Sequence, residues 1–381
     1  MPSSLRFLVL LLLLAVAAAT AACADDGDDA LDGPADGAGD ASQPADNDAD
    51  DAEDGRDDAE GADDADDADD AGDGEAAADD DEDVGEDLPD PAEVGANELG
   101  YVPVLMYHRL LEGGGGEYDR SPEGYRAELE RLFEEGYWPI TTSDLVRGEI
   151  DVPAGRSPVV LTFDDSTVEQ ARLDDDGEIA SDTAIGILLE VAEEHEVEAT
   201  GSLYVNAAPF AGQDGVLERL DELGFELGNH TANHVNLAQI PPAEAERELA
   251  EGVEVITSRV DAEVATLSLP LGIWPDDREV AYAGEHGGTA YEHEGILLVG
   301  ADPAPSPHSA EFDPLAIPRI RSQAQETEEP DYGSEFWLDW LAAEDDRRYV
   351  SDGDPDRVSF PDDLEVELSD EVQERANPYE R

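Results

Sequence analysis

The distribution of apolar and polar residues divides the chain into three parts. A short apolar run covers about residues 7–16, and residues 24–98 contain almost no apolar side chain. From about residue 101 onward, apolar runs alternate with amphipathic segments, an arrangement that predicts β-strands and α-helices in turn. We therefore expect one folded domain over residues 99–345.

Apolar runs rich in β-branched residues predict the strands, which are Tyr101–Arg109, Tyr137–Thr141, Val159–Asp165, Ala199–Asn206, Phe225–Gly228, Val264–Gly272, Gly295–Ala301 and Leu315–Ile320. Apolar positions with a helical period predict helices over Ser121–Glu135, from Ser143, over Asp182–Glu194, Leu217–Leu223, Pro241–Arg259 and Phe336–Leu341. About eight strands that alternate with helices in roughly 240 residues favour an α/β barrel over a doubly wound sheet. Residues 346–381 predict a hairpin around Asp352-Gly353 and a frayed acidic tail.

The run Val159–Asp165 ends in two adjacent carboxylates, Asp164 and Asp165. Neighbouring side chains on a strand point to opposite faces, so both acids can serve one site only where the strand ends and the chain turns. Such a pair suggests that one acid binds a metal and the other transfers a proton. The alternative interpretation is a turn at the end of a strand.

Two histidines provide further metal ligands. His230 and His234 are four residues apart, and one helical turn would place both imidazoles on the same side. With Asp165 they form a plausible hydrolytic Zn²⁺ site that leaves positions open for water. Without a metal, His230 would cap a helix and His234 would belong to the core.

Charge excludes several classes of partner. The chain has 99 acidic and 20 basic residues, and its net charge is −79. Nucleic acid and anionic lipid both require clustered cations, so neither is an expected partner. The composition is typical of a surface solvated in concentrated salt, and attraction of a cationic partner is the weaker alternative.

The N-terminus has the three zones of a secretory signal over residues 1–22: Arg6, the apolar run and then small residues. TAAC at residues 20–23 resembles a bacterial lipoprotein signal, in which Cys23 would carry the lipid. We therefore expect an extracellular protein that is anchored to the membrane only through Cys23, with plain secretion as the alternative. We also expect a monomer.

Residues 24–98 contain 34 acids and one basic residue, Arg56. Such a segment cannot bury enough apolar surface to offset the entropy of ordering it, so residues 23–98 are expected to be a disordered acidic tether. Calcium chelation is the alternative, but the segment has no EF-hand loop pattern.

Three motifs resemble those of the NodB-homology polysaccharide deacetylases, carbohydrate esterase family four. They are TFDD at 162–165, HTxxH at 230–234 and PxG at 270–272. The resemblance covers about Tyr101 to Ser322 and implies a distorted (β/α)7-type barrel.

The resemblance also implies the role of each residue. Asp165, His230 and His234 would bind a divalent metal, typically zinc, and Asp164 would be the general base. The backbone N–H of Leu271, after Pro270, would stabilise the oxyanion.

The chain departs from the family at the general acid and at an arginine. The usual Leu-x-x-His motif near the domain's end is absent, but VPVLMYH at 102–108 is similar to a branch that includes poly-N-acetylglucosamine deacetylases, in which His108 would be the acid. Ser268 stands where an arginine usually orients the base. Arg319 is the candidate to replace that arginine at the base and the substrate.

The expected activity is removal of N-acetyl groups from an N-acetylglucosamine-containing polysaccharide. Trp274 either stacks on a sugar ring or packs in the fold. An O-acetyl polysaccharide esterase and a metal-free carbohydrate-binding lipoprotein remain as alternatives. The chain lacks the His-x-Asp pair that is usual in nonhaem iron oxygenases. A zincin protease would need glutamate at the position of Thr231.

Overall fold

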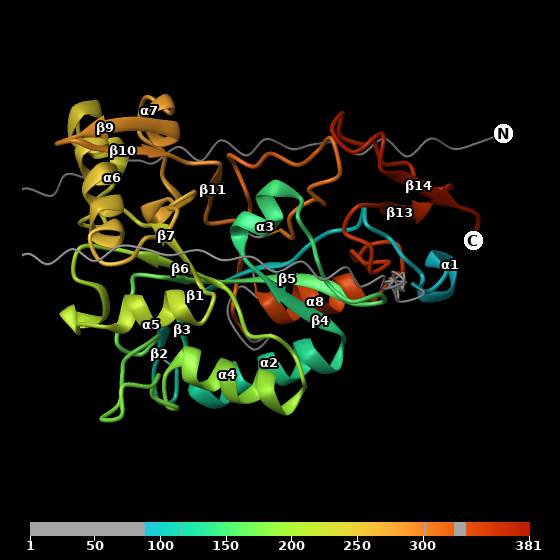
Figure 1. The fold of residues 1–381 in the computed structure, drawn as a ribbon, viewed down its shortest axis with the longest axis horizontal. Helices are drawn as coiled ribbons and strands as arrows, with labels where there is room; N and C mark the ends of the chain where they lie inside the picture. Colours follow the sequence, from blue (N-terminus) through green and yellow to red (C-terminus); the bar gives the residue numbers. More distant parts are fainter. Residues whose placement is uncertain (1–87, 115, 301, 324–332) are drawn as a thin grey trace, which may run out of the picture. The chain divides into compact units, whose positions relative to one another are not determined.

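The computed structural model describes residues 88–114, 116–300, 302–323 and 333–381 (Figure 1). The predicted signal, Cys23 and the predicted tether up to residue 87 lie outside the described residues. In the described part, no helix has the length and apolar character needed to cross a membrane.

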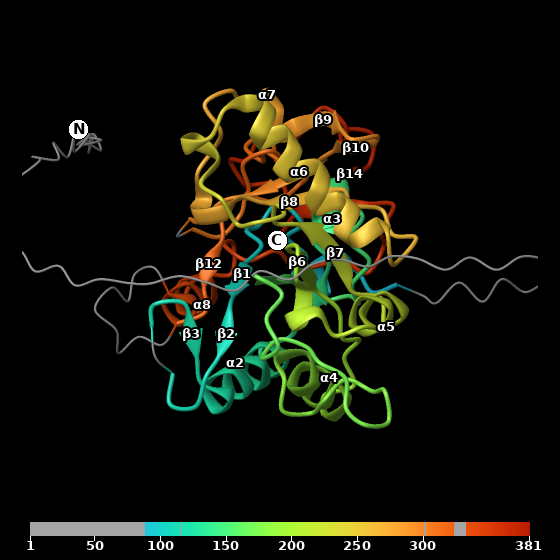
Figure 2. The ribbon, with the colours of Figure 1, turned by 90° about the vertical axis from the view of Figure 1, so that its left-hand side faces the viewer.

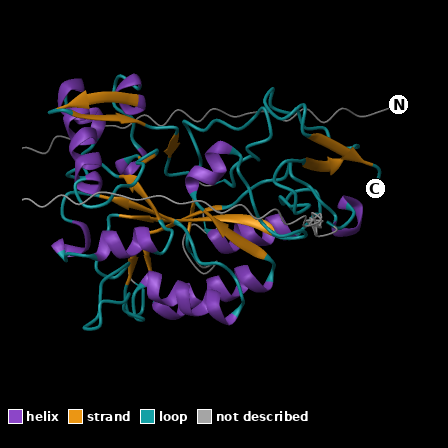
Figure 3. Cartoon of the chain, viewed as in Figure 1, coloured by secondary structure: helices purple, strands orange, loops and turns teal. Residues whose placement is uncertain are grey.

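A sheet of eight parallel strands forms the centre of the fold (Figure 3). Its members are β1 (Val104–Tyr107), β4 (Tyr137–Ile140), β5 (Ser157–Asp164), β6 (Ser202–Val205), β7 (Glu226–Asn229), β8 (Thr266–Ser268), β11 (Gly295–Leu297) and β12 (Ile320–Arg321). The order is β11-β8-β7-β6-β5-β1-β12, and β4 pairs with the first half of β5. Leu297 of β11 also bridges to Ile317, just before β12, so the sheet curls toward closure. The predicted α/β barrel-like fold is confirmed.

Helices and short strands surround this sheet. The helices are α1 (Pro91–Val94), α2 (Pro122–Glu134), α3 (Thr142–Arg147), α4 (Ala184–Glu194), α5 (Val216–Glu222), α6 (Pro242–Thr257), α7 (Glu279–Tyr282) and α8 (Ser334–Ala342). The remaining strands are β2 (Arg109–Leu110), β3 (Asp119–Arg120), β9 (Ala283–His286), β10 (Thr289–Glu292), β13 (Val358–Pro361) and β14 (Ala376–Tyr379). Figures 1 and 2 show α2 and α4 together on one side of the sheet, and α6 with the β9–β10 hairpin on another.

Helix α2 illustrates how the sequence forms its elements. The Ser121 side chain accepts a hydrogen bond from the N–H of Gly124, and Pro122 occupies the first turn, as predicted. Its apolar face, with Leu129 and Leu132, is buried in the core between helix and sheet.

Strand β5 is buried along its whole length. All eight of its residues are buried, and it pairs with β1, β4 and β6. The β-branched pattern of Val159–Phe163 suits a parallel strand covered on both faces. Because β5 is held on every side, the position of its carboxyl end, Asp164, is rigidly defined.

The structure corrects the predicted ends of the domain. Residues 88–98, expected in the tether, are ordered: α1 is capped by Asp90, and Ala96, Asn97 and Glu98 are buried. The predicted hairpin around Asp352-Gly353 does not form, because Val350 bridges to Asn97 and β13 pairs with β14. The C-terminus is not frayed, because β14 pairs in parallel with β13.

Candidate active site

Both predicted carboxylates lie at the carboxyl end of β5. The strand ends at Asp164, and the chain then turns through Asp165 and Ser166, which have φ angles of 79° and 45°. Positive φ is uncommon for residues other than glycine, so this turn is strained. It brings the partly exposed Asp165 carboxylate to the same site as buried Asp164.

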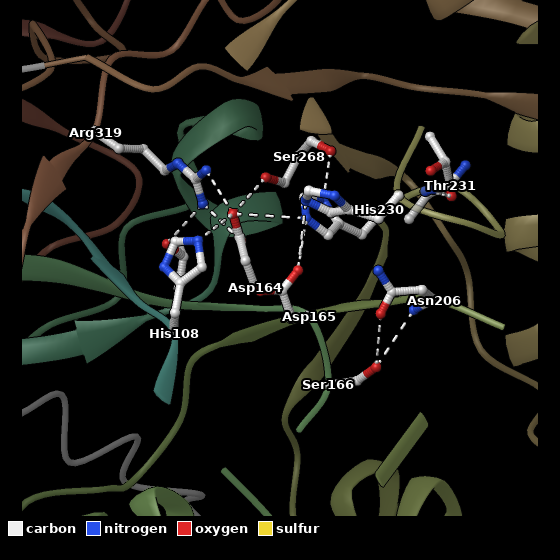
Figure 4. Close-up of polar contacts among 12 residues, drawn as sticks. His108, Asp164, Asp165, Ser166, Asn206, His230, Thr231, Ser268 and Arg319 are labelled. Atoms are coloured by element: carbon white, nitrogen blue, oxygen red, sulfur yellow. Dashed lines mark hydrogen bonds and ion pairs between the residues drawn. The ribbon is translucent and has the colours of Figure 1, made fainter. Parts of the chain in front are cut away.

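Asp165, His230 and His234 converge at one point. Figure 4 shows Asp165 and His230 facing each other. The Oδ1 atom of Asp165 is 3.5 Å from the Nε2 atom of each histidine. One ligand atom from each of the three residues lies within 4.8 Å of the others. The three residues that the sequence selected are therefore together.

The histidine pair is brought together by a loop and not by the predicted helical turn. Thr231 and His234 have φ angles of 60° and 49°, which are incompatible with a right-handed helix. The Oδ1 atom of Asn229 accepts a hydrogen bond from the N–H of Thr231, and buried Glu248 accepts one from the N–H of Asn233. These side chains satisfy the loop backbone in place of helical hydrogen bonds.

The orientation of His230 suits a metal ligand. Its Nδ1 atom lies 2.8 Å from the carbonyl oxygen of Ser268. A carbonyl only accepts hydrogen bonds, so Nδ1 carries the proton and Nε2 carries the lone pair. That Nε2 atom is buried without a hydrogen-bond partner, and it faces Asp165. A divalent cation would satisfy it, and a carboxylate with two imidazoles is a donor set that zinc accepts.

Asp164 is held by a buried arginine and a serine. Its Oδ1 and Oδ2 atoms accept hydrogen bonds of 2.8 and 2.7 Å from Arg319, and Oδ2 accepts one of 3.0 Å from the Ser268 hydroxyl. Burial raises the pKa of Asp164, but Arg319 and then His230 lower it more, so the pKa lies below its usual value. Asp164 is therefore an ionised carboxylate.

His108 also lies beside Asp164. Its Nε2 atom is 3.9 Å from Oδ2 of Asp164, and its ring centroid is 4.9 Å from that of Tyr118. Burial lowers the pKa of His108, and the partial opposing effect of Asp164 and Asp165 leaves it below its usual value. The imidazole therefore faces the carboxylates in its neutral form at neutral pH.

These side chains line a cavity of about 330 Å³, whose lining residues are His108, Arg109, Tyr118, Asp164, Asp165, His230, His234, Leu271 and Val299. Leu271 follows buried Pro270, has a φ of 61° and is 56% exposed. Leu271 therefore lies at the cavity, as the resemblance to the deacetylase family implies.

Two predicted substrate contacts occupy other positions. Trp274 does not line the cavity, because its ring packs edge-on against Tyr282 with the guanidinium of Arg278 4.6 Å from its centroid. Arg319 is fully buried, so it cannot contact a substrate, and it instead binds Asp164 in place of the missing family arginine.

Sequence reasoning missed Tyr118, Arg109 and Val299 as cavity residues, and it missed the Ser268 hydroxyl as a partner of Asp164. A run of four glycines at 113–116 is a sequence signal for a loop, and Tyr118 follows it two positions later. Nothing in the local sequence indicated Val299, which reaches the cavity only because β11 lies beside β8.

Comparisons with known proteins agree with this site. Residues 151–290 match the family model described as polysaccharide deacetylase. A chitooligosaccharide deacetylase of Sinorhizobium fredii is 32% identical over 91 residues, which are 24% of this chain and 41% of that protein. A chitooligosaccharide deacetylase of a Bradyrhizobium species is 30% identical over 128 residues, 33% of this chain and 51% of that protein. The chain thus spans about half the length of these relatives or less.

Among solved structures, the Streptococcus pyogenes deacetylase PplD in complex with acetate resembles the chain with a TM-score of 0.45 and 17% identity. The match covers 63% of this chain and 97% of that one.

Proposed function

We propose that the protein is a metal-dependent hydrolase that removes N-acetyl groups from an N-acetylglucosamine-containing polysaccharide, because residues 151–290 match the polysaccharide deacetylase family model. The observation that carries the proposal is the convergence of Asp165, His230 and His234 within 4.8 Å, with the ionised Asp164 beside them. The match to chitooligosaccharide deacetylases supports an N-acetylated substrate.

Asp165, His230 and His234 would hold the metal, for which we propose Zn²⁺. A divalent ion there would lower the pKa of a coordinated water to about 7 and polarise the substrate carbonyl. The Ser268 carbonyl fixes the His230 tautomer, so the imidazole presents its lone pair without reorganisation.

Asp164 acts as the general base in this proposal. It accepts a proton from the attacking water, whose oxygen adds to the acetyl carbon. Arg319 and Ser268 hold both carboxylate oxygens in place, so the base keeps one orientation. In this respect Arg319 and Ser268 are positioning residues.

His108 acts as the general acid. The carbon–nitrogen bond breaks as the amine receives a proton, and the products are acetate and a free amino sugar. Since His108 is neutral at rest and lies 3.9 Å from Asp164, the proton that Asp164 accepts has a short path to the imidazole and then to the leaving nitrogen. The backbone N–H of Leu271 donates to the oxyanion, a contribution typically worth ~3 kcal/mol.

The test is release of acetate from chitooligosaccharides by the full chain, with and without chelator, together with metal analysis. Wild-type protein should contain about one zinc per chain and release acetate, and Asp165→Ala should lose both. Asp261→Ala, a change at an exposed acidic residue that does not line the cavity, is the control. A chelated wild type that keeps full activity would overturn the metal dependence, and release from acetylated xylan alone would favour an O-acetyl esterase.

We also propose that the chain is exported and tethered through a lipid on Cys23. The support is the signal-like pattern of residues 1–22 and the TAAC sequence. In cell fractionation, the wild type should stay with membranes and Cys23→Ser should be released. A variant that remains in the membrane fraction would contradict the anchor.

A further inference from the structure

Exposed apolar side chains are concentrated at the mouth of the cavity. Among the described residues, six large apolar side chains are exposed: Leu88, Tyr118, Leu271, Ile273, Val299 and Val366. Tyr118, Leu271 and Val299 line the cavity, and Ile273 is two residues from Leu271. On a surface dominated by acids, such a grouping indicates a binding site more than a chance exposure.

The residues of this apolar surface come from separate parts of the chain. Gly272 approaches Val299 so closely that a Cβ atom at that glycine would lie 2.8 Å from the Val299 backbone nitrogen, which keeps Leu271 and Val299 adjacent. Tyr118 stands on the loop between β2 and β3, with its ring against that of His108. The three side chains therefore border the cavity from separate parts of the chain.

Ion pairs fix the Tyr118 loop on both sides. The Asp119 carboxylate accepts hydrogen bonds of 2.8 and 3.0 Å from Arg109, and Glu117 is ion-paired with Arg321. The guanidinium of Arg321 also lies 5.6 Å from the centre of the Tyr118 ring. Tyr118 is thus presented by an anchored loop, at a low entropic cost of ordering when a ligand binds.

The same ion pairs determine the charge at the mouth. Arg109 is the one arginine among the described residues that line the cavity, and Asp119 already engages it. Arg319 is buried and bound to Asp164. A ligand carboxylate would therefore have to displace a protein carboxylate, while the net charge of −79 repels polyanions at low ionic strength.

We propose that Tyr118, Leu271 and Val299 form an apolar platform for an uncharged pyranose ring, and that this platform selects neutral N-acetylated glycans over glycans that carry carboxylates. The proposal rests on the proposed function and names the substrate class of that site. The C–H face of a sugar ring is apolar, and a site of this kind combines apolar walls with a few polar groups that orient the ligand.

The first test compares kcat and KM of the full chain for an N-acetylglucosamine pentamer and for an oligosaccharide of the same length that bears lactyl carboxylates. Val299→Ser should raise KM for the neutral pentamer by roughly fivefold and leave kcat within about twofold, because it removes apolar contact and no reacting group. Val366→Ser changes an equally exposed valine outside the cavity and should change neither value. Tyr118→Ala, which removes the ring from the platform, should raise KM as well.

Salt and ligand charge provide the second readout. From about 0.5 to 3 M NaCl, KM for the pentamer should stay constant or fall, since salt screens charge and does not weaken apolar burial. Equal kcat/KM for the carboxylated and neutral oligosaccharides at the lower salt would overturn the proposal. An unchanged KM in Val299→Ser and Tyr118→Ala would overturn it as well.

A binding measurement separates this proposal from the proposed function. Calorimetry with Asp165→Ala should show binding of the neutral pentamer that is weakened by adding Val299→Ser and not by adding Val366→Ser. If the wild type releases no acetate but this pattern holds, the platform stands and the hydrolase assignment fails. Absence of pentamer binding, or equal binding by both double variants, would refute the platform.

Discussion

Asp164 and Glu98 are both buried acidic residues, but their pKa values are shifted in opposite directions. Asp164 at the end of β5 binds the buried guanidinium of Arg319, and its pKa lies below the usual value. Glu98 accepts backbone N–H groups from Asp352 and Ser359, and its pKa is raised from 4.5 to about 8, first by burial and then by the negative charge of Asp352.

The difference shows that burial alone does not decide ionisation. Both side chains lose water, which disfavours the charged form in each case. Asp164 has a fully buried cation of its own, whereas the nearby Arg357 donates to Asp352 and not to Glu98. Asp164 therefore gives the active site a permanent negative charge. The Glu98 carboxyl group, which contacts Asp352 and Ser359 near the C-terminus, titrates near neutral pH instead.

Removing Arg319 should have the largest effect. Arg319→Gln leaves the Asp164 charge buried without its cation, so we expect a loss of roughly 3–5 kcal/mol in the free energy of unfolding and at least about a 100-fold loss of activity. Urea unfolding and acetate release measure the two effects. The control is Arg147→Gln, whose exposed ion pairs should contribute less than about 1 kcal/mol.

A double-mutant cycle sharpens this test. Arg319→Gln combined with Asp164→Asn should be much less destabilised than the sum of the single changes predicts, because no buried charge remains. Additive losses would mean that Arg319 stabilises the fold through its contacts with Leu298 and Thr162 and not through Asp164.

Glu98 should make stability depend on pH. A folded pKa of about 8 against 4.5 means that the folded state binds the proton more tightly, so the stabilisation is complete below about pH 4.5 and is lost as pH rises through 8. The loss is on the order of 3–5 kcal/mol. The pH dependence that Asp164 contributes has the opposite sign. Its stabilisation is present above about pH 3.8 and is lost only as pH falls further.

Glu98→Gln should flatten the decline of stability between pH 5 and 8, as measured by urea unfolding at several pH values. Exposed Glu93→Gln is the control and should leave the slope unchanged. If the slope of the Glu98 variant equals that of the wild type, a different group titrates in this range.

Arg357→Gln should have a smaller effect than Arg319→Gln. Its Nε atom donates a 2.7 Å hydrogen bond to fully buried Asp352, but about a third of its own side chain is exposed, and water can replace part of the lost interaction. We expect a loss of about 1–2 kcal/mol, measured by thermal unfolding. Activity should not change, and a loss like that of Arg319→Gln would remove the contrast between the regions.

Ser268→Ala should have the smallest effect. It removes one hydrogen bond to Asp164 while Arg319 still holds both carboxylate oxygens. We expect a decrease of about 1 kcal/mol in stability and a decrease in kcat of roughly threefold to tenfold. Exposed Ser258→Ala is the control, and an effect above 100-fold would mean that Ser268 contacts the reacting groups.

The local features of this protein could be predicted from short stretches of its sequence. The β-branched run before Asp164 identified a buried strand, Ser121-Pro122 identified the start of α2, and the motifs around Asp165, His230 and His234 identified the candidate site. Each depends on neighbouring residues, because propensity, capping and strand-end position act over short stretches of chain.

The contacts between side chains that are distant in the sequence depend on how the whole chain folds. Arg319 reaches Asp164 across 155 positions, and Glu98 and Asp352, 254 positions apart, face each other in the C-terminal region. Val299 reaches the cavity for the same reason, and the loop conformation of His230–His234 depends on Glu248. These contacts arise from the curling of the sheet and the closing of its ends, which no local pattern of residues encodes.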